Sequence, residues 1–139
     1  MANIQITPYL FFSGTASAAI EFYCKALGAE VDDLRRYGDL PDLSPENRER
    51  VMHATLRVGG AKLMISDVTV ERGPASTQSN VDVLLDFEDP EAMARAFDAL
   101  AEGGEVGAAL HDTFWGARFG MLRDRYNINW MFHHTLTAS

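Results

Sequence analysis

The stretch AAIEFYCKALGAEV at residues 18–31 decides the fold, because AMARAFDALAEGGEV at residues 92–106 is a degenerate second copy of it. In each copy an apolar stripe with helical spacing runs into a glycine and then into Glu-Val, the start of a strand. Strand-like segments flank both copies. The sequence therefore predicts a duplicated architecture that contains both helices and strands.

Eight strands and two helices are expected around these stretches. The first half should contain a strand at 3–12, a helix from an N-cap at Thr15 to Gly28, and strands at 29–37, 51–58 and 61–67, the last two joined by a Gly59-Gly60 hairpin. The second half repeats this order with a strand at 80–87, a helix that starts at Asp89-Pro90, and strands at 105–111, 117–123 and 128–134. Each half is therefore a βαβββ module.

We expect one α+β domain, residues 1–139, with a first module at 1–70 and a second at 78–139. One such module has too little core to stand alone, so the two should associate through their sheets. The expected result is a curved mixed sheet that forms a cup. A functional site is then expected inside the cup.

Composition narrows the classes of partner. The chain has 139 residues, of which 47% are hydrophobic, and its 20 acidic and 12 basic residues give a net charge of −8. That charge repels phosphate backbones and anionic lipids, so nucleic acid and membrane surfaces are poor partner candidates. The sequence has neither a membrane-spanning stretch nor a secretory start, and its single cysteine, Cys24, cannot form an internal disulfide. A cytoplasmic location is expected.

Two polar segments interrupt the regular pattern. Residues 38–50 (GDLPDLSPENRER) contain Ser44-Pro45-Glu46, which suits one short helical turn. Residues 68–79 (VTVERGPASTQS) link the two modules. Either segment could cover the cup, although a plain surface connection is the commoner use of such loops. Residues 38–50 are the lid candidate.

Several short motifs make the resemblance specific. Phe22-Tyr23 in the first helix and DRYNINW at 124–130, together with the paired modules, resemble the vicinal oxygen chelate superfamily of glyoxalases, bleomycin-resistance proteins and extradiol dioxygenases. Finer features look like its PhnB-like branch, namely PYLFFSG at 8–14, Ser66-Asp67, EGG at 102–104, FWG at 114–116 and RFGMLRD at 118–124. Asn127 stands where that branch usually has glycine, and asparagine is the next best residue for a left-handed turn.

The resemblance implies four positions for a divalent metal at the floor of the cup, and here they fall on Pro8, Met64, Asp82 and Met131. The alternation in AKLMISD and INWMFHH directs Met64 and Met131 to the cup and the larger apolar residues to the helices. A thioether is a poor substitute for a carboxylate around Zn²⁺, Ni²⁺ or Fe²⁺, and proline has no donor atom. We therefore expect no metal cofactor.

The histidines and the carboxylate of Asp67 each have more than one interpretation. His53, His133 and Asp82 form a conceivable rearranged site for a divalent metal, or the histidines simply donate hydrogen bonds in or beside an apolar cavity. Asp67 closes its strand and is either a general base or a strand-end cap. Asp67 and His133 are the candidate catalytic residues.

The hairpins of the second module carry further candidates. Arg118 is either an anion clamp or part of a salt-linked turn with Arg123, Asp124 and Arg125. Phe114 and Trp115 line the mouth of the cup or pack at a subunit contact. The predicted ligand-binding residues are Met64, Asp82, Trp115, Arg118, Asn129, Met131 and His133.

A methionine-lined cavity adapts to ligands of varied shape, which suits binding or sensing. We therefore expect a small organic molecule to bind in a metal-free cup. The resemblance also implies a homodimer. The alternative is an enzyme: a metal-dependent lyase, isomerase or dioxygenase with a rearranged ligand set, or a metal-free acid/base enzyme that uses Asp67 or His133.

Overall fold

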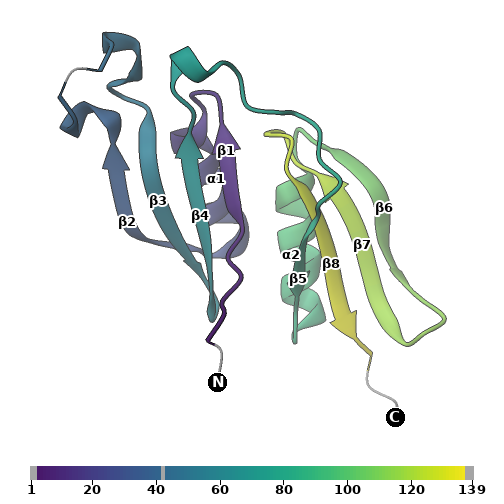
Figure 1. The fold of residues 1–139 in the computed structure, drawn as a ribbon. Helices are drawn as coiled ribbons and strands as arrows, with labels where there is room; N and C mark the ends of the chain where they lie inside the picture. Colours follow the sequence, from purple (N-terminus) through teal and green to yellow (C-terminus); the bar gives the residue numbers. More distant parts are fainter. Residues whose placement is uncertain (1–2, 42, 137–139) are drawn as a thin grey trace. The chain divides into compact units, whose positions relative to one another are not determined.

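The computed structural model describes residues 3–41 and 43–136, and the chain divides into two compact units, Met1–Ala75 and Ser76–Ser139. Each unit has one four-stranded sheet and one long helix (Figure 1). The predicted α+β class and the duplicated βαβββ order are confirmed. Within the described residues, no helix is long and apolar enough to cross a membrane.

The first unit has the sheet order β1-β4-β3-β2, with β1 parallel to β4 and the other neighbours antiparallel. Its elements are β1 (Tyr9–Phe12), α1 (Ala16–Leu27), β2 (Glu30–Arg36), β3 (Val51–Val58) and β4 (Ala61–Asp67), with short 3₁₀ turns η1 (Tyr37–Asp39), η2 (Pro45–Asn47) and η3 (Val70–Arg72). The turn η2 is the short helical turn that the sequence predicts after Ser44.

The second unit repeats this topology in the order β5-β8-β7-β6, with β5 parallel to β8. Its elements are β5 (Val83–Asp86), α2 (Pro90–Ala101), β6 (Glu105–Asp112), β7 (Ala117–Arg123) and β8 (Asn129–Thr135). Asp89 caps α2 as predicted, because its side chain accepts a hydrogen bond from the N–H of Glu91.

The first strand of each unit is shorter than predicted. Residues 3–8 lie outside β1, and the side chains of Ile4 and Ile6 are 81% and 93% exposed. Pro8 precedes β1 and has no N–H to donate to a strand ladder, so the pairing with β4 begins only at Tyr9. Likewise β5 covers residues 83–86 rather than 80–87.

Each helix covers one face of its own sheet. In the first unit α1 buries Ala19, Ile20 and Tyr23, and the sheet contributes fully buried residues such as Ile65. In the second unit Phe97 of α2 meets Phe132 of β8 edge to face, with ring centroids 5.0 Å apart. Burying side chains of this size stabilises each unit by about 1.5–3 kcal/mol per residue.

The opposite face of each sheet is not covered by the helix of the same unit, and we call this face the open face. On β8 the predicted alternation is confirmed, since Trp130 and Phe132 are buried while Asn129, Met131 and His133 are only half-buried. On β4 the same holds for buried Leu63 and Ile65 against half-buried Met64. The period of two thus assigns one set of side chains to the core and the other to the open face.

Candidate functional site

The open face of the second unit has an apolar floor of sulfur and aromatic side chains. Met131 on β8 pairs with Met121 on β7 and with Leu84 on β5, so these three side chains are neighbours on one face. His133 pairs with Phe119 in the next row. Thioethers are flexible and polarisable, so this floor can follow the outline of varied apolar ligands.

A cleft of about 270 Å³ lies at one end of this floor. It is lined by Asp82, Glu105, Val106, Gly107, Met121, Leu122, Arg123 and Asn129. Two of the lining side chains are already anchored, because Arg123 donates to the carbonyl of Thr77 at 2.6 Å and Asn129 donates to that of Ser79 at 3.3 Å. The structure thus places two of the predicted ligand-binding residues, Asp82 and Asn129, in one cleft.

His133 is paired with a carboxylate at the other end of the floor. Its Nδ1 lies 3.1 Å from Oδ1 of Asp86, and the two residues are register partners on β8 and β5. An ionised carboxylate only accepts hydrogen bonds, so in a neutral ring we expect the proton on Nδ1, which leaves Nε2 as an acceptor. Such an imidazole can take a proton from a bound molecule.

The open face of the first unit carries Met64 beside a polar row. Tyr9 on β1 and Thr55 on β3 flank Met64. His53 links them, because its Nδ1 lies 2.8 Å from the hydroxyl of Tyr9 and its Nε2 lies 3.1 Å from that of Thr55. Burial, with a smaller effect of Tyr37, raises the pKa of Tyr9, which keeps the phenol protonated.

An aromatic column continues from this row. The rings of Tyr9 and Phe11 stack at 4.8 Å with an angle of 7°, and the guanidinium of Arg72 lies 5.8 Å from the centre of Phe11. Both aromatic side chains are about two-fifths exposed, at 40% and 43%. Both rings are therefore partly accessible to a molecule on the open face.

The positions that the resemblance implies for a divalent metal do not fit one here. On the open faces, the register partner of Met64 is Tyr9 and the register partner of Met131 is Leu84. The phenol and thioether of the first unit, and the alkyl group and thioether of the second, are each unsuited to Zn²⁺, Ni²⁺ or Fe²⁺, which prefer imidazole, thiolate and carboxylate. Across residues 3–41 and 43–136, no three His, Cys, Asp or Glu side chains are grouped to hold a metal ion.

Asp67 is committed to the main chain. Its Oδ1 accepts hydrogen bonds from the N–H groups of Gly14 and Ala16, and its Oδ2 accepts one from Val51. The side chain is 2% exposed. Thr15 occupies the predicted N-cap position but makes no capping bond with its hydroxyl, so Asp67 caps α1 in its place. This geometry suits the strand-end cap better than the general base.

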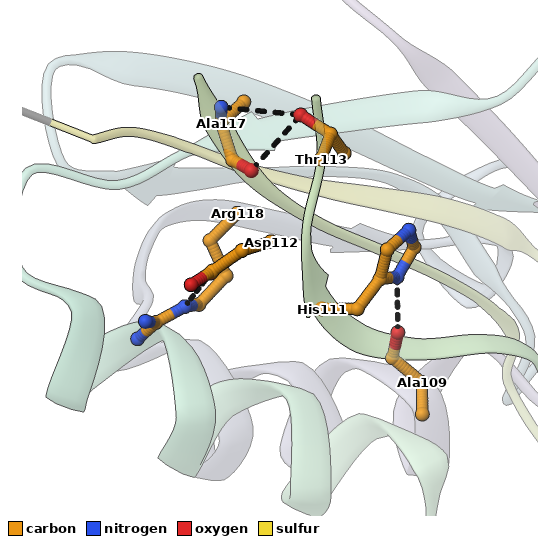
Figure 2. A network of polar contacts seen from close by, with 6 residues as sticks. All are labelled: Ala109, His111, Asp112, Thr113, Ala117 and Arg118. Atoms are coloured by element: carbon orange, nitrogen blue, oxygen red, sulfur yellow. Dashed lines mark hydrogen bonds and ion pairs between the residues drawn. The ribbon is translucent and has the colours of Figure 1, made fainter. Parts of the chain in front are cut away.

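Arg118 and Trp115 are not part of the floor of the open face. Figure 2 shows Arg118 beside Asp112. Arg118 on β7 is the register partner of His134 on β8, two residues from Phe132. Its Nε donates a hydrogen bond to Oδ1 of Asp112 at 2.8 Å. This hydrogen bond lowers the pKa of Asp112 and raises that of Arg118. Trp115 is at the turn of the β6–β7 hairpin and is 59% exposed.

The predicted ligand-binding set omits several residues of the floor and cleft, among them Phe119, Met121 and Arg123 on β7. The signal was present in RFGMLRD at 118–124. There Phe119, Met121 and Arg123 alternate with Gly120 and Leu122, which face the core. Asp86 was missed as well. It lies inside the predicted strand at 80–87, and only its pairing with His133 gives it a role.

Comparisons with known proteins agree with this arrangement. A family model described as Glyoxalase/Bleomycin resistance protein/Dioxygenase superfamily matches residues 5–132. Protein YjdN from Escherichia coli (strain K12) is 32% identical over 141 residues, which cover 94% of this chain and 95% of that protein.

Two solved structures share the fold over nearly the whole chain. The crystal structure of protein PA1353 from Pseudomonas aeruginosa has a TM-score of 0.87 and 35% identity, covering 97% of this chain and 100% of that one. The PhnB protein from Bacillus cereus has a TM-score of 0.79 and 26% identity, covering 95% of this chain and 100% of that one. The sequence motifs at 8–14 and 114–124 thus pointed to the correct branch.

Proposed function

This chain belongs to the glyoxalase/bleomycin resistance protein/dioxygenase superfamily, and from that premise we propose that it binds a small organic molecule without a metal ion. The observation that carries the proposal is the open face of the second unit. There the thioethers of Met121 and Met131 form an apolar floor, and Asp82 and Asn129 offer oriented polar atoms beside it. A mostly apolar surface with a few placed polar groups is the usual composition of a small-molecule site.

The charges of the cleft favour one class of ligand. Asp82 and Glu105 are two carboxylates, whereas Arg123, the cation of the lining, is hydrogen-bonded to the carbonyl of Thr77. A neutral or cationic molecule with hydrogen-bond donors therefore fits this cleft better than an anion. His133 and Met131 are proposed to contact the apolar part of the same molecule.

Methionine methyl groups give a direct test of binding. The chain has six methionines, and Met93 is fully buried on the sheet-facing side of α2 while Met121 and Met131 lie on the open face. In protein labelled with ¹³C at the methionine methyl groups, small aromatic amines and amides should shift the signals of Met121 and Met131. Met93 is the internal control, and its signal should not move. Compounds that shift none of the three, across a broad library, would contradict the proposal.

A pair of asparagine variants locates the polar contact. Asn129→Ala removes a side chain that lines the cleft, whereas Asn80→Ala makes the same change at an exposed residue nearby that does not line it. Asn129→Ala should weaken the best binder by about tenfold, since one hydrogen bond is lost. Equal affinities in the two variants would remove Asn129 from the site.

Elemental analysis tests the metal-free part of the proposal. Protein purified without chelator should hold much less than one transition-metal ion per chain, and His53→Ala and His133→Ala should not change that content. His53 already has both ring nitrogens in hydrogen bonds. A stoichiometric metal that is lost in either variant would instead favour a metal-dependent lyase, isomerase or dioxygenase.

The pairing of His133 with Asp86 favours a second candidate function, a metal-free acid/base enzyme. In that case the imidazole would remove a proton from a bound carbon acid or hydroxyl. NMR spectra of each bound compound over time separate the two functions. Chemical conversion that is abolished in His133→Gln, while the Met131 signal still shifts, would establish the enzyme.

We also propose that the protein is a homodimer, because dimers are common in this superfamily and among soluble proteins in general. Light scattering coupled to size-exclusion chromatography should give twice the mass of one chain. The mass of a single chain at micromolar concentration would contradict it.

A further inference from the structure

The first unit contains a second cleft, about 780 Å³ in volume, that lies apart from its open face. The cleft sits where the β1–α1 loop meets the end of β2 and the segment before β3. Its lining is polar and consists of Ser13, Gly14, Thr15, Ser17, Arg36, Glu46, Glu49 and Arg50. No residue of the proposed ligand-binding set belongs to it.

Both arginines of this cleft are held by neutral groups. Nη1 of Arg36 donates to the carbonyl of Glu49 at 2.7 Å and to the hydroxyl of Ser17 at 3.1 Å. Nη1 of Arg50 donates to the carbonyl of Val68 at 2.7 Å. Among the ion pairs of the described residues, none involves either arginine. Their charges are therefore positioned by the fold without being neutralised by a contacting carboxylate.

The guanidinium of Arg50 lies directly against Gly14. A Cβ atom at Gly14 would lie 3.1 Å from Nη2 of Arg50 and 3.3 Å from its Cζ. Because Gly14 has no side chain, the guanidinium of Arg50 can pack closely against its backbone. A guanidinium has five N–H donors, and the bond to Val68 uses only Nη1, so most of them remain for another acceptor.

Hydroxyl groups complete the set of donors. Ser13 and Ser17 use their oxygens as acceptors, from the N–H of Ala75 and from Arg36, which leaves each hydroxyl proton to donate. The hydroxyl of Thr15 makes no capping bond. The N–H groups of Gly14 and Ala16 already donate to Asp67, so recognition here depends on side chains.

We propose that this cleft binds the oxyanionic group of a small molecule, a phosphoryl or a carboxylate group. Arg36 and Arg50 supply the charge and the paired donors that match such a group, and the hydroxyls supply additional hydrogen bonds. Glu46 and Glu49 also line the cleft, so they oppose an anion and keep its affinity modest. Replacing either carboxylate by an amide should therefore tighten binding.

An amide NMR titration with inorganic phosphate and, separately, with acetate tests the proposal at constant ionic strength. Residues 13–17 should show saturable shifts with at least one of the two anions. Saturation by phosphate alone identifies a phosphoryl site, and saturation by acetate alone identifies a carboxylate site. The proposal is overturned if the amide shifts of residues 13–17 grow linearly with both anions, or if neither anion shifts these signals.

Matched arginine variants make the test specific. Arg50→Gln should weaken the bound anion by about tenfold or more, because a charge-assisted hydrogen-bonding group is lost. Arg48→Gln makes the same charge change at an exposed residue outside the cleft lining, and its affinity should stay within about twofold of the wild type. Equal weakening in both variants would mean that only net charge matters, which overturns the site.

A second pair of variants covers the case in which Arg50→Gln does not fold, since Arg50 also tethers Val68. Thr15→Ala should weaken the anion and Glu49→Gln should tighten it. Opposite signs in these two variants support the site, and unchanged affinity in both overturns it. The methyl signals of Met121 and Met131 should not respond to phosphate or acetate. The anion site and the proposed ligand site of the second unit are therefore tested independently.

Discussion

Nδ1 of His133 lies 3.1 Å from Oδ1 of Asp86, across the parallel pair of strands β8 and β5. The side chain of His133 is 28% exposed and that of Asp86 is 66% exposed, so the imidazole is the more enclosed partner. The carboxylate fixes which ring nitrogen is the donor, and the other nitrogen is available to a ligand.

The first prediction concerns the tautomer of His133. In the neutral ring the proton should reside on Nδ1, and Asp86→Ala should shift the population toward the Nε2–H form because the acceptor is gone. Long-range ¹H–¹⁵N correlation spectra distinguish the two tautomers. His111, whose Nδ1 is 2.8 Å from the carbonyl of Ala109, is the internal control and should be unaffected. An Nε2–H form of His133 in the wild type would contradict the assignment.

The second prediction separates a structural carboxylate from a chemical one. Asp67→Asn keeps the shape of the side chain but turns an NH₂ group toward the N–H of Val51, so one main-chain donor loses its acceptor. The free energy of unfolding should fall by about 2–4 kcal/mol. Urea denaturation measures the change. Asp86→Asn, at an exposed residue, is the control and should cost less than about 0.5 kcal/mol.

If Asp67 served mainly as a general base, its amide variant would fold with nearly normal stability. A loss below about 0.5 kcal/mol, within the range of ordinary surface substitutions, would therefore contradict the structural role.

The elements that the sequence predicts best are those whose signal is local and periodic. The apolar stripe of α2 ends at a glycine, and Gly59-Gly60 joins two runs of alternating residues. The alternation of β8 correctly separates Trp130 from Met131. These patterns depend on the geometry of a single helix or strand, so one sequence suffices to recognise them.

The features that were missed depend on residues far apart in the sequence. Thr15 has the residue type of an N-cap, yet Asp67 satisfies the first turn of α1 from a strand that lies 51 residues away. The register partner of Met64 is Tyr9, which local patterns did not predict, because the register of a parallel pair is not encoded by a tight turn. Side-chain partners across a sheet follow from register, which local patterns do not determine.

The third prediction tests a close backbone approach at Gly104. A Cβ atom there would lie 2.2 Å from the carbonyl oxygen of Arg123 and 2.9 Å from Cα of Asp124, and neither can move without shifting the strand. Gly104→Ala should cost about 3 kcal/mol, at the upper end for an overpacked site. Gly60→Ala is the matched control, because nothing lies within 4 Å of its added methyl group. Thermal unfolding of both variants measures the difference, and equal melting temperatures would contradict the packing.

The fourth prediction concerns a loop attachment that weakens in acid. The carboxylate of Glu71 in η3 accepts hydrogen bonds from Ser44 at 2.5 Å and from Asn47 at 2.9 Å. Asn47 is fully buried, and its side-chain oxygen accepts from the N–H of Val70. These bonds, that of Ser44 first, lower the pKa of Glu71 below its ordinary value of 4.5. The charged form therefore holds segment 44–47 to the turn that follows β4.

The pH dependence follows from the direction of that shift. A carboxylate with a lowered folded-state pKa contributes its full stabilisation above the ordinary value of 4.5, and the contribution is lost as the pH falls through the lowered pKa. Glu71→Gln should accordingly melt at a lower temperature than the wild type at pH 7, and the two melting curves should converge as the pH drops below 4.5. Glu21→Gln, on the exposed side of α1, is the control and should track the wild type throughout. A Glu71→Gln deficit that stays constant down to pH 3 would show that the charge of Glu71 contributes nothing to the attachment.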